Sequence, residues 1–125
     1  MKNTIGMLIA TLFLARDLAH REHLKATGPG SYAAHMALGD FYAGIVDLAD
    51  TLTETYQGRF ERLVDIPLLA NDADGNILDT LRAQREWIRE ARYDAVPKDE
   101  SPLHNIIDEI ESLYCLTIYK LKFLA

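Results

Sequence analysis

The sequence predicts an all-α protein built as a bundle of four helices. Apolar residues recur every three or four positions along four segments, and no segment alternates apolar and polar residues as a half-buried strand would. Glycine and proline separate these segments, above all at Gly28, Pro29 and Gly30. The chain has 125 residues, enough for a domain with its own core. We therefore expect a single helical-bundle domain over residues 1–125.

The first helix is expected from about Asn3 to Lys25. Its apolar stripe consists of Ile5, Leu8, Leu12, Ala15 and Ala19. Lys2 followed by an apolar run is also typical of a short signal peptide. We interpret the run as a helix because its pattern continues into Arg16 and Asp17. The run is also too short to cross a bilayer, so no membrane association is expected.

The second helix is expected from about Tyr32 to Gln57, with Ser31 as its N-cap and Gly58 after its end. Its core stripe consists of Leu38, Tyr42, Ile45, Ala49, Leu52 and Tyr56. Two long helices joined by a short Gly-Pro-Gly turn most simply form an antiparallel hairpin.

Residues 59–76 are irregular and end in a polar turn cluster. Asp72 and Asp74 match two ligand positions of a calcium-binding loop. The first ligand position of that loop would be Ala70, and Leu81 replaces the closing glutamate. A plain loop is therefore favoured over a calcium site.

The third helix is expected from about Ile77 to Ala91, and the fourth begins with Ser101 as its N-cap and Pro102 at its first helical position. The inner face of the third helix contains Leu78, Leu81, Ile88 and Ala91. The seam of the fourth contains Leu103, Ile106, Ile110, Leu113, Thr117, Leu121 and Leu124.

The fourth helix is apolar on a second side as well, because Leu116, Ile118 and Phe123 lie off its seam. A subunit contact would explain this second apolar surface. Cys115 is interpreted as a buried structural thiol and His104 as a residue without a special role.

The charge and the cysteine content limit the function classes. A net charge of −6 argues against direct nucleic-acid binding, which needs clustered lysine and arginine. The single cysteine cannot form an internal disulfide, which agrees with the reducing conditions of the cytoplasm. We therefore expect a cytoplasmic protein.

The candidate site lies between His20 and Glu54. His23 and His35 are 12 residues apart across the turn, Asp50 follows His35 by 15 residues, and Glu54 follows Asp50 by four. On a helix, Asp50 and Glu54 lie about 60° and 100° around the axis from His35, so the three share one flank beside the core stripe. Such a flank suits a metal site completed at a contact between two subunits. No glutamate stands three residues before a histidine, which disfavours the usual di-iron site within one bundle.

This stretch resembles the ferroxidase region of the Dps family, the mini-ferritins of starved bacteria. In that family a histidine near the end of the first helix is followed by a His-x-x-x-Asp motif. An Asp-x-x-x-Glu pair further along faces the symmetry mate. His23, His35, Asp50 and Glu54 stand at matching spacings, within a resemblance over residues 15–57 and a weaker one over 101–124.

The resemblance implies a ferritin-like bundle with a hairpin of the first two helices, and a homo-oligomer of at least two chains. It also implies Fe(II) bound by His23 and His35 of one subunit with Asp50 and Glu54 of the next, and oxidised by O₂ or peroxide. No other catalytic or cofactor-binding residue is expected. Two histidines and two carboxylates also suit zinc or manganese, and the residue types do not choose among the metals.

The sequence departs from the family at three points. Gly39 stands where the family has the aspartate four residues after His35, Leu24 replaces a tryptophan, and the chain is short. The short length keeps a phage-encoded member of the family among the expectations. Gly39 removes a bridging carboxylate, and this motivates an alternative: a catalytically inactive bundle that acts by protein–protein contact, for instance as a phage modulator of a host factor.

Overall fold

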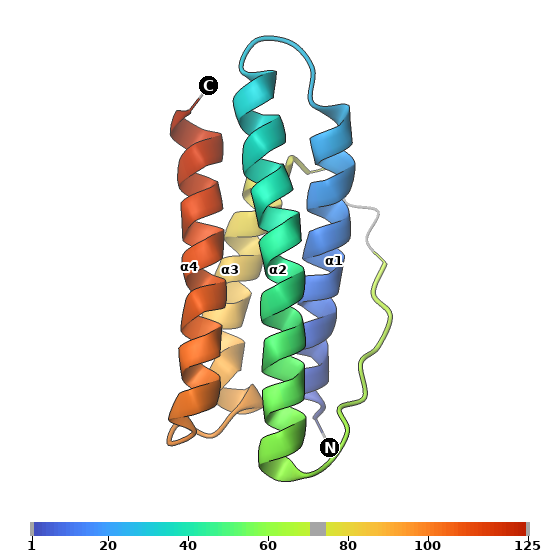
Figure 1. The fold of residues 1–125 in the computed structure, drawn as a ribbon, viewed down its shortest axis with the longest axis vertical. Helices are drawn as coiled ribbons and strands as arrows, with labels where there is room; N and C mark the ends of the chain where they lie inside the picture. Colours follow the sequence, from blue (N-terminus) through green and yellow to red (C-terminus); the bar gives the residue numbers. More distant parts are fainter. Residues whose placement is uncertain (1, 71–74, 125) are drawn as a thin grey trace.

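The computed structural model describes residues 2–70 and 75–124, which form four α-helices and contain no β-strand (Figure 1). The helices are α1 (Thr4–Lys25), α2 (Ser31–Phe60), α3 (Ile77–Ala95) and α4 (Ser101–Phe123). The predicted all-α class with four helices is confirmed. The calcium alternative at Asp72 and Asp74 lies outside the described residues.

The four helices enclose a common core. Helices α1 and α4 each contact both α2 and α3, so every helix packs against two others. Within the described ranges, no helix has both the length and the apolar character needed to cross a membrane.

The helix starts agree with the predictions to within one residue, but the capping residues differ. Ser31 and Ser101, the predicted N-caps, are the first residues of α2 and α4. The capping positions are Gly30 and Glu100, and neither makes a side-chain cap hydrogen bond. Gly30 has a φ of 77°, a left-handed conformation that glycine adopts without steric cost and that turns the chain into α2.

Helices α2 and α3 both extend beyond their predicted ends. Helix α2 passes through Gly58 and reaches Phe60, because one glycine weakens a helix by only about 1 kcal/mol and packing can outweigh this. The ring of Phe60 contacts the ring of Tyr56, with 4.7 Å between the centroids. Helix α3 continues past Ala91 to Ala95, which is buried.

The predicted core stripe of α1 is buried throughout, which confirms that prediction. In α2 and α4 the true inner faces lie one position away from some predicted residues. Phe41 is fully buried whereas Tyr42 is half-buried, and Ile107 and Tyr114 are more deeply buried than their predicted neighbours. Phe41 and Tyr114 meet edge to face across the core, with 5.1 Å between ring centroids.

An extended segment, residues 61–70, runs along the outside of α1 (Figure 1). Asn3 caps α1 by accepting a hydrogen bond from the Gly6 N–H and also donates to the Asp65 carbonyl oxygen at 2.8 Å. A Cβ atom at Gly6 would overlap that carbonyl oxygen. The missing side chain of Gly6 therefore allows the segment to lie against α1.

The outer surface of α4 contains one correction. Cys115 is exposed rather than buried, because Tyr114 and Thr117 hold the inner positions and residue 115 points about 100° away from residue 114. Its Sγ lies 3.6 Å from Nη1 of Arg85. The second apolar side of α4 is present in part: Leu116 and Phe123 are 50% and 66% exposed, whereas Ile118 is partly buried against the core.

Candidate metal centre

His23 and His35 stack against each other where α1 and α2 meet. Their rings are nearly parallel, with 3.7 Å between the centroids and 18° between the planes. His23 lies in the last turn of α1 and His35 at the end of the first turn of α2, and the short connection over residues 26–30 brings the two helix ends together. Both side chains are half-buried.

Reciprocal hydrogen bonds hold the two rings. His23 Nδ1 lies 2.6 Å from the carbonyl oxygen of His35, and His35 Nδ1 lies 2.9 Å from the carbonyl oxygen of His23. A carbonyl oxygen only accepts hydrogen bonds, so these contacts assign a proton to each Nδ1. Each neutral ring then has an unprotonated Nε2, the form that binds metals. Metal-binding histidines commonly donate their other ring N–H in this way.

The surroundings of the pair are aromatic and tightly packed. The His20 ring stacks on Tyr42, with 4.2 Å between centroids and 7° between planes, and the Tyr42 ring lies 5.3 Å from the ring of His23. A Cβ atom on Gly39 would lie 3.1 Å from Cε1 and 3.3 Å from Nδ1 of His23. The space that a side chain at position 39 would occupy is therefore partly taken by the His23 ring.

Asp50 and Glu54 lie apart from the histidine pair within the chain. Both are exposed on α2, and Asp50 lies about 22 Å along the helix from His35 at the usual rise of about 1.5 Å per residue. Over residues 2–70 and 75–124, no group of three or more histidine, cysteine or acidic side chains is close enough to hold a metal ion. Within a single chain the two predicted histidines therefore meet, but the two predicted carboxylates lie far from them.

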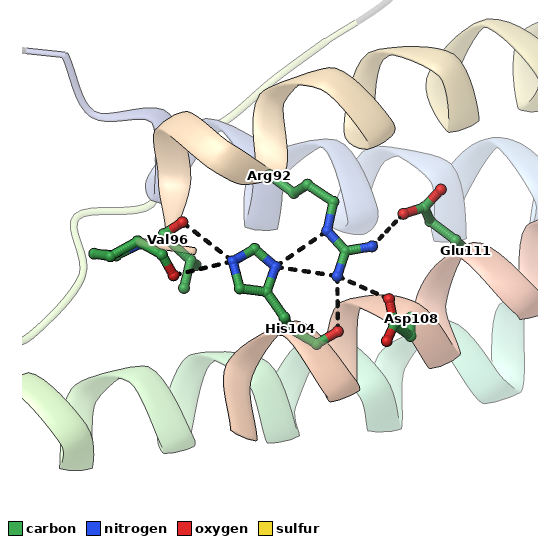
Figure 2. A network of polar contacts seen from close by, with 6 residues as sticks. Arg92, Val96, His104, Asp108 and Glu111 are labelled. Carbon is green, nitrogen blue, oxygen red and sulfur yellow. Dashed lines mark hydrogen bonds and ion pairs between the residues drawn. The ribbon is translucent and has the colours of Figure 1, made fainter. Parts of the chain in front are cut away.

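Arg92 and His104 form a second polar cluster, which the sequence reasoning missed (Figure 2). They are only 6% and 9% exposed. Arg92 donates to His104 Nδ1 at 3.1 Å and to the His104 carbonyl oxygen at 2.8 Å. It also forms ion pairs with Asp108 at 2.8 Å and Glu111 at 2.5 Å.

The contacts of His104 indicate a structural role for this cluster. Its Nδ1 faces the donors of Arg92, and its Nε2 lies within 3.2 Å of the carbonyl oxygens of Val96 and Pro97. Both ring nitrogens are therefore used inside the protein, and neither is available to a ligand. The cluster ties the end of α3 to the first turns of α4 (Figure 2). One signal in the sequence could have revealed it: Arg92 stands four residues after buried Ile88, on the inner face of α3.

Comparisons with known proteins give a family but no described relative. No curated protein and no solved structure matches the chain. A family model that carries the description "family of unknown function (DUF5856)" matches residues 23–121, a range that starts at His23 and includes the Arg92–His104 cluster. The chain therefore belongs to the DUF5856 family.

Proposed function

We propose that this is a ferritin-like metal-binding protein in which two chains share each site. His23 and His35 of one chain and Asp50 and Glu54 of another would bind a divalent metal ion. The observation that carries the proposal is the reciprocal hydrogen bonding of the two Nδ1 atoms. This bonding assigns both rings the tautomer in which Nε2 can bind metal.

The order and connection of the helices support a ferritin-like arrangement. Residues 26–30 and 96–100 are short connections, whereas 16 residues separate α2 from α3, and the first ten of them, residues 61–70, run along the outside of the bundle (Figure 1). One long crossover between the second and third helices is typical of ferritin-like folds. In that arrangement α1 and α2 form an antiparallel hairpin.

A two-fold contact along α2 would complete the site. The histidines lie near the start of α2 and the carboxylates beyond its middle. A second chain running in the opposite direction would bring its carboxylates to the histidines of the first. Two-fold symmetry makes the two sites of such a dimer identical. Asp50 and Glu54 are exposed, so a second chain can reach them.

The ligand set suits several metals. Two imidazole nitrogens and two carboxylates fit Fe(II), Zn²⁺ and Mn²⁺. The net charge of −6 favours the approach of cations. Fe(II) would be the substrate of a ferroxidase reaction with O₂ or peroxide as the oxidant, and comparing iron oxidation by the protein with that in buffer tests this activity.

The metal-binding proposal is tested by calorimetric titration of the metal-free protein with Co²⁺, a stand-in for Fe(II) and Zn²⁺. We expect saturable binding that is lost in His35→Ala, because that variant lacks one Nε2 ligand. His20→Ala is the matched control: its ring stacks on Tyr42 and is not one of the proposed ligands. No binding by the wild type, or equal binding by His35→Ala, would overturn the proposal.

A bundle that acts through protein contact is the second candidate. The specific observation in its favour is the exposed apolar side of α4, where Leu116, Tyr119 and Phe123 are each at least 50% exposed. A host factor bound by a phage-encoded protein is one example of such a partner. In this case the tagged protein would capture a partner that a Leu116→Glu, Phe123→Glu variant does not, although both bind Co²⁺ equally. Recovery of the protein alone would count against this function.

A further inference from the structure

We propose that Gly39 is a positioning residue for His23, and that any side chain at position 39 weakens metal binding. This inference rests on the proposed metal-binding function. Gly39 would then leave room for the His23 ring, whereas the sequence alone was interpreted as lacking a carboxylate ligand at this position.

The contact between Gly39 and His23 leaves little room. A Cβ atom at position 39 would lie 3.1 Å from His23 Cε1 and 3.3 Å from Nδ1. Non-bonded carbon atoms are best separated by about 3.5–4.0 Å, so the ring would have to move by a few tenths of an ångström. The ring cannot move without changing other contacts, since Nδ1 is hydrogen-bonded at 2.6 Å and the ring face stacks on His35.

A displaced His23 ring would bind metal less well. Its Nδ1–H bond to the His35 carbonyl sets the direction in which Nε2 points, and such outer contacts typically change metal affinity by about 10- to 100-fold. An aspartate at position 39 begins with the same Cβ atom. It would therefore displace His23 before its carboxylate could serve as a ligand.

The helix alone would favour another residue at this position. Glycine within a helix is less stable than alanine, because the unfolded chain gains more conformational freedom. In Gly39→Ala the gain in helix stability is therefore opposed by the displacement of the His23 ring, whereas metal affinity only falls. Gly58 lies in the same helix and has no atom within 4 Å of an added Cβ, so Gly58→Ala is the matched control.

The test compares full-length wild type, Gly39→Ala, Gly39→Asp and Gly58→Ala by Co²⁺ titration, the visible spectrum of bound Co²⁺ and thermal unfolding. We expect Gly39→Ala to bind Co²⁺ about tenfold more weakly, with a changed spectrum, and to remain folded at the temperature of the titration. Gly39→Asp should bind no better than Gly39→Ala. Gly58→Ala should bind as wild type does.

Two results would overturn this role of Gly39. They are wild-type affinity and spectrum in Gly39→Ala, or tighter binding of Co²⁺ by Gly39→Asp than by Gly39→Ala. If the wild type binds no Co²⁺, the proposed function fails. The position of the His23 ring against Gly39 can still be tested from the imidazole ¹⁵N resonances of the metal-free proteins. Gly39→Ala should then shift the His23 resonances and leave those of His104 unchanged. Unshifted His23 resonances would refute the displacement of the ring by a side chain at position 39.

Discussion

Replacing Arg92 with methionine should strongly destabilise the fold. Methionine keeps most of the buried aliphatic volume, so the change removes chiefly the guanidinium. His104 Nδ1 and its carbonyl oxygen would lose a buried donor, and Glu111, whose side chain is 20% exposed, would lose its ion pair. The pair with Asp108 contributes little, because that side chain is 64% exposed.

The contacts of Arg92 with His104 and Glu111 determine how much folding free energy the Arg92→Met variant loses. Removing one partner of a buried charged network costs about 3–5 kcal/mol, and the partial exposure of Glu111 places this case near about 3 kcal/mol. For a chain of this length that corresponds to a fall in unfolding midpoint of about 12 °C. Urea unfolding followed by circular dichroism measures the free energy directly.

Arg82→Met is the matched control for Arg92→Met. Arg82 also lies on α3, but its ion pair with Asp79 is exposed, with side chains 40% and 65% accessible. Its loss should cost less than about 0.5 kcal/mol. If Arg92→Met costs less than about 1 kcal/mol, the cluster does not hold α3 to α4 as argued. Metal binding should survive in Arg92→Met, because Arg92 contacts His104, Asp108 and Glu111 and none of the four proposed ligands.

Two further predictions concern the packing. Gly6→Ala should destabilise the protein by about 2 kcal/mol in urea unfolding, because the new Cβ would overlap the Asp65 carbonyl oxygen; unchanged stability would contradict this contact. Burial raises the pKa of Tyr114 above its ordinary value, whereas an unfolded tyrosine ionises near pH 10. The stability that Tyr114 contributes is therefore complete below about pH 10 and is lost as the pH rises further. Urea midpoints measured from pH 8 to 11 should fall less steeply in Tyr114→Phe than in wild type, and equal slopes would refute the argument.

The helices were predictable because apolar spacing reports the period of a helix directly. All five predicted core residues of α1 are buried. In α2 and α4 the apolar residues cover a wider part of the helix surface than the core buries. Spacing alone does not tell which of these apolar residues face the core. For this reason Tyr42 and Leu113 were predicted in the core although Phe41 and Tyr114 hold the buried positions, and Cys115 was expected inside.

Much of the candidate site depends on contacts between helices, which spacing cannot report. The sequence placed His23 and His35 on either side of one turn, but their reciprocal hydrogen bonds depend on how α1 meets α2. Gly39 was interpreted as a missing ligand because its contact with His23 is a tertiary one. Arg92 was overlooked for a related reason: an arginine is buried only when another element supplies its partners, here His104 and Glu111 of α4.

The central claim is that the metal site is shared between two chains, and a mixing experiment tests it most directly. One variant carries His23→Ala and His35→Ala, and the other carries Asp50→Asn and Glu54→Gln. Neither should bind Co²⁺ alone. After unfolding and refolding together in equal amounts, half of the dimers should be mixed and have one intact site of two, giving about a quarter of wild-type binding. Binding by the carboxylate variant alone, or no binding by the mixture, would contradict a shared site.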